Sequence, residues 1–86
     1  MIDDAIAVQA IQAITGPRAQ THGDAQETMQ RTAALWSAYL GRDLTPAQVA
    51  VCNLLQKLAR SRNYDRDHYI DVIGYALIAE EAGRPW

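Results

Sequence analysis

The sequence predicts an all-α fold, a compact bundle of four helices completed by homo-oligomerisation. Apolar residues recur at spacings of three and four along four segments, and nothing alternates with period two for long enough to propose a strand. Ala, Ile and Leu dominate the apolar residues and Phe is absent, which favours close-packed helices over sheets. Hydrophobic residues make up 49% of the 86 residues, a generous share for so small a domain. This surplus predicts that a partner chain covers part of the apolar surface.

The first two helices are delimited by glycine and proline. The first is expected over residues 3–15, where Gly16-Pro17 stops it because proline cannot continue the hydrogen-bond ladder. The polar segment 18–23 is expected to be a loop. The second helix is expected over residues 24–40, and Gly41 supplies its stop. Its apolar stripe consists of Met29, Ala33, Trp36 and Leu40.

A capping signal predicts the start of the third helix, and a long apolar run predicts the fourth. Thr45-Pro46-Ala47-Gln48 has a hydroxyl at the N-cap, proline at the first helical position and glutamine where it closes a capping box. The third helix then runs towards Arg62 with a stripe of Val51, Leu54, Leu55 and Leu58. The last helix, over residues 66–82, has few polar faces and is expected to be the most buried. Gly74 within it marks either a close helix–helix approach or a tolerated glycine, since it costs about 1 kcal/mol relative to alanine. We find no repeat or linker, so residues 1–86 form one domain.

Charge and composition exclude several classes of protein. The net charge of −2 argues against a protein that coats nucleic acid. A helix-turn-helix is disfavoured because the start of the third helix, residues 46–51, carries no charge where base-reading side chains should lie. No stretch is apolar enough to span a membrane, and Asp3 and Asp4 occupy the place of a basic signal-peptide region, so a cytoplasmic location is expected. Cys52, the only cysteine, is expected to be a buried, inert thiol.

Charged residues on the second and third helices occupy positions that simple solvation does not explain. Asp24, Glu27 and Arg31 share one face of the second helix. Asp24 is also a good N-cap, and Asp-x-x-Glu is close to a capping box, so a structural role remains open. On the third helix, Lys57 and Arg60 lie three apart, beside the apolar stripe.

The last helix carries two carboxylates on one face. Asp67, Asp71 and Tyr75 are spaced by four residues. Asp71 lies among apolar residues, so it must be paired, metal-bound or at an edge, because an unpaired buried charge costs several kcal/mol. A salt bridge to Lys57 or Arg60 would satisfy it, and the helix dipole alone favours Asp67 at a helix start. Taken together, two acid pairs on two helices with cations between them predict a site for Mg²⁺ and phosphate.

Four strings of residues resemble small proteins of unassigned function that are common in phages and prophages. The strings are Arg18-Ala-Gln-Thr-His22-Gly23-Asp24, Arg31-Thr-Ala-Ala-Leu-Trp36-Ser-Ala-Tyr-Leu40, Lys57-Leu-Ala-Arg60 and Asp67-His-Tyr-Ile-Asp71-Val-Ile-Gly74-Tyr75-Ala. The resemblance covers the chain from Thr15 to about Ala79. In helix order and acid placement, these phage proteins in turn resemble the MazG-type all-α nucleoside triphosphate pyrophosphatases.

That second resemblance implies a specific chemistry. MazG-type enzymes hydrolyse a (deoxy)nucleoside triphosphate to the monophosphate and pyrophosphate, assemble as dimers or tetramers, and hold Mg²⁺ with a Glu-x-x-Glu pair and a Glu-x-x-Asp pair. Asp24-x-x-Glu27 falls where the first pair should be, with Asp for Glu at its first position. Asp71 falls where the last Asp should be. His68 occupies the expected Glu position of the second pair, and the nearby acid is Asp67.

Two functions therefore stay open. The first is a Mg²⁺-dependent pyrophosphohydrolase, in which Glu27 and Asp71 are catalytic. Its metal ligands would be Asp24, Glu27, Asp67 and Asp71, and its substrate-binding residues Arg18, His22, Gly23, Lys57, Arg60 and Tyr75. The second is a catalytically degenerate binding module that sequesters a nucleotide or binds a host protein. Under both hypotheses, we expect a homodimer or higher homo-oligomer.

Overall fold

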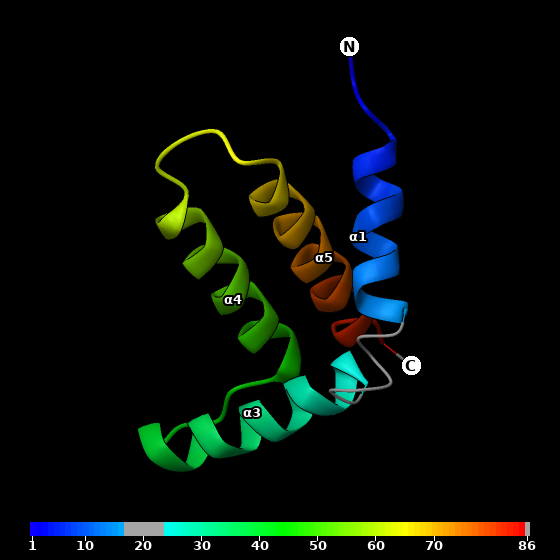
Figure 1. Ribbon diagram of the computed structural model, residues 1–86. Coiled ribbons are helices and arrows are strands. Elements are labelled where there is room, and N and C mark those ends of the chain that lie inside the picture. Colours follow the sequence, from blue (N-terminus) through cyan, green and yellow to red (C-terminus); the bar gives the residue numbers. More distant parts are fainter. Residues whose placement is uncertain (17–23, 86) are drawn as a thin grey trace.

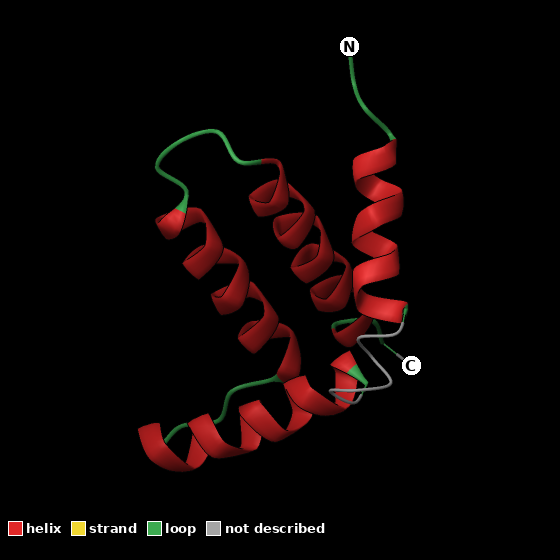
Figure 2. Cartoon of the chain, viewed as in Figure 1, coloured by secondary structure: helices red, strands yellow, loops and turns green. Residues whose placement is uncertain are grey.

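The computed structural model describes residues 1–16 and 24–85 and confirms the all-α class. Figure 1 shows the helices, which are α1 (Ala5–Thr15), α3 (Ala25–Leu40), α4 (Pro46–Arg60) and α5 (Arg66–Ala82). The described part of the chain contains no strand, and the remainder of it is loop or turn (Figure 2). None of the described helices has the length and apolar character needed to cross a membrane.

The four helices form an antiparallel pair with one helix beside it and one across its end. α4 and α5 are antiparallel neighbours joined by a short loop, and α1 runs alongside α5 (Figure 1). α3 crosses the end of this layer where α4 starts and α5 finishes. α5 packs against α1, α3 and α4, and only 6 of its 17 residues are exposed, against 8 of 15 in α4 and 10 of 16 in α3. It is therefore the most buried helix of the described chain, as predicted.

Local capping signals set the helix ends within about two residues of the predicted ones. The Asp24 carboxylate accepts a hydrogen bond from the backbone N–H of Gln26 and caps α3. Thr45 and Gln48 form the predicted capping box at the start of α4, with distances of 3.1 and 2.9 Å. Gly41 ends α3 with φ of 70°, a left-handed conformation that glycine adopts without strain.

The core lies where the first half of α3, the start of α4 and the second half of α5 meet. Its buried members are Met29, Ala33, Val49, Ala50 and Ile78. These residues hold the ends of three helices together, so the arrangement of α3 relative to the α4–α5 pair depends on a small cluster.

Gly74 lets α1 approach α5 closely. It is buried, and a Cβ atom added to it would lie 3.4 Å from Cγ2 of Ile14 on α1. Of the two predicted explanations for a glycine in the middle of this helix, close helix–helix approach is the one that the structure shows.

The prediction of which side of α4 is buried was wrong for most of the stripe. Val51, Leu55 and Leu58 are 45–56% exposed, whereas the neighbouring Val49 and Ala50 are completely buried. The cause is that α4 packs through positions 49, 50, 53 and 57, which turns the predicted stripe outward. Cys52 is exposed for the same reason, so it is not the buried thiol that the sequence suggested.

Candidate functional site

A half-buried ion pair joins α4 to α5. Nζ of Lys57 lies 2.7 Å from Oδ2 of Asp71, and the two side chains are 25% and 34% exposed. Lys57 lies seven residues, or two helical turns, after the buried Ala50, which puts it on the packed side of α4. Of the three roles predicted for Asp71, namely paired, metal-bound or at an edge, the structure shows a pairing.

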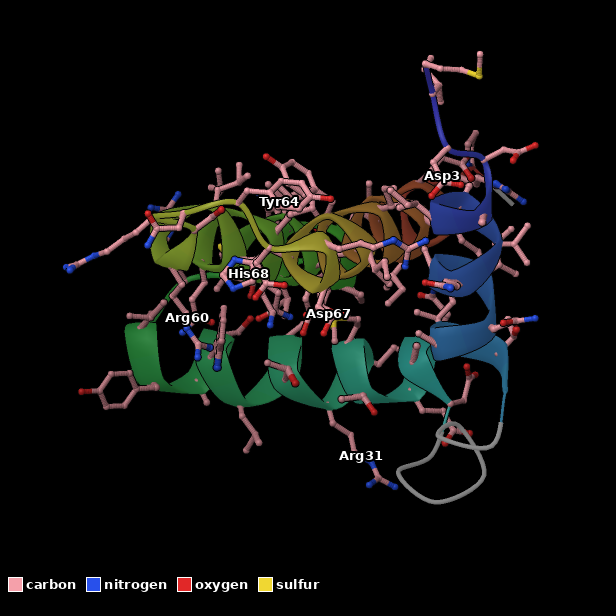
Figure 3. The ribbon with its side chains drawn as sticks, turned by 45° about the horizontal axis from the view of Figure 1, so that its top comes forward. Asp3, Arg31, Arg60, Tyr64, Asp67 and His68 are labelled. Carbon is pink, nitrogen blue, oxygen red and sulfur yellow. The ribbon has the colours of Figure 1, made fainter. Side chains whose placement is uncertain are left out.

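Further charged and polar residues lie within four positions of this pair along α4 and α5. Figure 3 shows Arg60, Asp67 and His68 on the same side of the α4–α5 pair, with Tyr64 on the opposite side and Arg31 projecting away from α3. His68 and Asp67 precede Asp71 by three and four residues, which puts all three on one face of α5. We call this set the α4–α5 polar face; its members are Lys57, Arg60, Asp67, His68 and Asp71.

His68 is held at one end of this face. Its Nε2 lies 3.7 Å from Oδ2 of Asp65, and its Nδ1 is buried without a hydrogen-bond partner among the described residues. Asp65 also accepts a hydrogen bond of 3.0 Å from the backbone N–H of Asp67 and so caps α5. Asp65 was not among the predicted site residues, although an aspartate directly before a predicted helix start is a recognisable N-cap signal.

Asp24, the first member of the other predicted acid pair, lies near the far end of α5. Asp24 borders a shallow depression of about 220 Å³ that is also lined by Ile78, Glu80, Glu81 and Arg84. Gln26 Nε2 donates a 3.1 Å hydrogen bond to the carbonyl oxygen of Ile78, which ties the start of α3 to this end. Asp71 precedes Ile78 by seven residues, about 10 Å along the helix axis.

The structure therefore brings Lys57 and Asp71 together but does not bring the two acid pairs together within one chain. Asp24 and Glu27 are both exposed, and Asp24 serves as a cap. Among residues 1–16 and 24–85, no three His, Cys, Asp or Glu side chains gather into a group that would hold a metal ion. The expected convergence of four carboxylates rested on helical spacing, which does not specify distances between helices.

The remaining predicted site residues divide into three cases. Arg60 is exposed in the last turn of α4, close to Lys57 along the helix. Tyr75 is half-buried and packs against the core cluster. Arg18, His22 and Gly23 lie outside the described residues.

Another ion pair joins Glu80 in the last turn of α5 to Arg84, which follows the helix. Nε of Arg84 donates to both carboxylate oxygens of Glu80 at 2.8 and 2.9 Å. This hydrogen bonding, helped by the attraction between the charges, holds the pKa of Glu80 below its ordinary value of 4.5. The pair lies at the depression beside Asp24 and not at the α4–α5 polar face.

The fold and the polar face define a small all-α domain with charged residues clustered on one helix pair. The chain belongs to the DUF6378 family, a domain of unknown function, whose family model matches residues 5–83. It is 42% identical over 83 residues to the Gene 55 protein of Mycobacterium phage L5, covering 93% of this chain and 53% of that protein. The Gene 55 protein of Mycobacterium phage D29 is 32% identical over 81 residues, with 92% and 54% covered.

These comparisons confirm the resemblance to phage proteins of unassigned function. The chain spans about half the length of the curated relatives that it matches. No solved structure matches it.

Proposed function

We propose that the chain is a Mg²⁺-dependent (deoxy)nucleoside triphosphate pyrophosphohydrolase, with the α4–α5 polar face as its phosphate site. The observation that carries the proposal is the Lys57–Asp71 contact of 2.7 Å, with Asp67 one helical turn before Asp71. The resemblance of the phage proteins to MazG-type pyrophosphatases supports it, since Asp71 falls on the last metal-binding position of that pattern.

The donor set of this face suits a single Mg²⁺ ion shared with substrate. Mg²⁺ is commonly bound through one or two carboxylates, several waters and the phosphates of a nucleotide. Asp67 and Asp71 offer two carboxylates on one face of α5. Bound there, Mg²⁺ would neutralise phosphate charge and lower the pKa of a coordinated water. Asp24 does not enter this single-chain site, because it lies towards the other end of α5.

The protein's own cations act on the phosphates. Lys57 is already held in position by Asp71, so its ammonium group is oriented before a phosphate arrives. Arg60, three residues later on α4, presents a guanidinium group suited to two-pronged phosphate contacts. One water is consumed as the bond between the α- and β-phosphates breaks, and both cations stabilise the charge that develops on the phosphate oxygens. The products are the monophosphate and pyrophosphate.

A second candidate is a module that binds a nucleotide without turnover, or binds a host protein. Two observations favour it: Lys57 already neutralises Asp71, and Asp24 is engaged as the cap of α3. Both acids would then have structural roles.

One experiment separates these candidates. A panel of canonical and modified nucleoside triphosphates is screened by thermal shift with and without Mg²⁺, followed by an assay for pyrophosphate. The hydrolase predicts a metal-dependent shift and pyrophosphate release, both lost in Asp71→Asn. Asp43→Asn, an exposed aspartate in the α3–α4 loop, serves as the matched control and should retain both.

The other outcomes are equally informative. A shift without pyrophosphate release would favour nucleotide sequestration. If no nucleotide shifts the melting temperature, both nucleotide proposals fail and a protein-binding role remains.

A further inference from the structure

The depression beside Asp24 lies where three helix ends meet. Asp3, just before α1, pairs with Arg66 at the start of α5. Further along the two helices, Ile14 of α1 lies against Gly74 of α5. α1 and α5 therefore run side by side in the same direction, and both end at the depression, where α3 begins (Figure 1).

The depression has an apolar part that the chain leaves open. Four side chains of α1 and α5 form it, namely Ile11, Ile14, Leu77 and Ile78. Ile11 is 48% exposed and Leu77 is 39% exposed, so both keep a large share of their surface in water. The volume of about 220 Å³ lies below the about 300–1,000 Å³ that is typical of sites for small organic ligands. This space suits one long side chain better than a nucleotide.

The charged residues that line the depression are mostly acidic. They are Asp24, Glu80, Glu81 and Arg84, so three carboxylates and one guanidinium give a formal net charge of −2. Arg84 pairs with Glu80. Within the described part of the chain, neither Asp24 nor Glu81 belongs to an ion pair. Two carboxylates therefore remain available to an incoming cation.

The acids of α5 lie at the helix end that disfavours them. A helix C-terminus carries a partial negative charge, which cations stabilise and carboxylates oppose. The last turn of α5 contains Glu80 and Glu81 and no basic residue, and the last turn of α1 has no basic residue either. Both helix ends thus add to the negative potential of the depression. Charges placed against such a local rule are expected where function requires them.

We propose that this depression docks a lysine side chain from a segment of another protein. The aliphatic stem of the lysine covers Ile11 and Leu77, and its ammonium group meets the carboxylate of Glu81 at the rim. Charge selects this occupant, because three carboxylates and two helix C-termini outweigh one guanidinium. Since the depression lies at the far end of α5 from the α4–α5 polar face, this proposal does not depend on the nucleotide chemistry proposed above.

The first test is an NMR titration of the chain labelled at its isoleucine and leucine methyl groups. The probe is a pentapeptide with neutral ends and a lysine between two leucines. The methyl signals of Ile11, Ile14 and Leu77 should shift and saturate, whereas those of Leu58, which is 50% exposed on α4, should stay in place. Norleucine in place of the lysine keeps the stem without the charge and should weaken binding about fivefold or more. Glutamate in its place should remove binding.

The second test changes the depression and keeps the lysine peptide. Glu81→Gln removes one charge at nearly constant shape and should weaken binding about two- to fivefold. Asp43→Asn, in the α3–α4 loop, is the matched control for an exposed acid and should leave the affinity unchanged.

Four results would overturn the proposal. They are no methyl shift with the lysine peptide, equal affinity for the lysine and norleucine peptides, equal affinity of the wild-type chain and Glu81→Gln, and tighter binding of free 1,5-diaminopentane than of the peptide. A second copy of the chain as the occupant would show itself without any peptide, because the same methyl signals would then shift with the concentration of the chain. That result would also overturn the proposal.

Discussion

The strength of the Lys57–Asp71 contact can be measured with a double-mutant cycle. The variants are Lys57→Met, Asp71→Asn and the two combined. At 2.7 Å, two unit charges attract by about 1.5 kcal/mol in the dielectric of water, and more where solvent is partly excluded. Exposed pairs contribute about 0.2–1 kcal/mol, whereas breaking a fully buried pair costs about 3–5 kcal/mol. Because these side chains are about one quarter to one third exposed, we expect a coupling energy of about 1 kcal/mol.

Each single substitution leaves one partly desolvated charge without its partner. We therefore expect Lys57→Met and Asp71→Asn each to lower the free energy of unfolding by about 1–2 kcal/mol, and the double variant to lose less than the sum. Urea unfolding followed by far-ultraviolet circular dichroism measures all four free energies. A salt series is the control, because a partly buried pair should keep part of its coupling at high salt.

The reasoning fails if the coupling energy is below about 0.3 kcal/mol, which lies within the scatter of additive, independent sites. In that case each charge would be solvated independently. The claim that Asp71 orients Lys57 before a phosphate binds would then have no energetic basis.

Three further predictions concern packing and titration. Val49→Ala should lower the free energy of unfolding by about 2 kcal/mol in urea titrations, because Val49 is the largest fully buried side chain among the described residues. A loss below about 0.5 kcal/mol would contradict its place in the core. Gly74→Ala should change the free energy of unfolding by less than about 1 kcal/mol. Gly74→Leu should lower it by about 2 kcal/mol or more, because the larger side chain displaces Ile14. Equal effects of the two substitutions would contradict the close approach of α1 to α5. Arg84→Met should raise the pKa of Glu80 towards 4.5 in an NMR titration, with an unchanged pKa as the contrary result. Since the folded pKa is lowered, the Glu80–Arg84 pair stabilises the fold above pH 4.5, and this contribution disappears as the pH falls through the folded pKa.

The helix ends were predictable because their signals are local. The Thr45–Gln48 capping box and the left-handed Gly41 each depend on a few consecutive residues, and the structure contains both. The buried side of α4 was not predictable in this way. Its true packing side includes Asn53, whose Nδ2 donates to Sδ of Met29 at 3.6 Å, and Lys57, which pairs with α5. Only the contacts with α3 and α5 show that Asn53 and Lys57 have polar or ionic partners on the packed side of α4.

Of the candidate site, the pairing of Lys57 with Asp71 was predictable from the sequence. The position of Asp24 relative to this pair was not. Asp71 had to be satisfied in an apolar helix, and Lys57 was one of two named partners, so their contact is one of the predicted outcomes. No comparable requirement forced Asp24 and Asp71 to lie in the same site. A cap residue lies where its helix begins, and α3 begins beside the second half of α5, where Gln26 reaches Ile78.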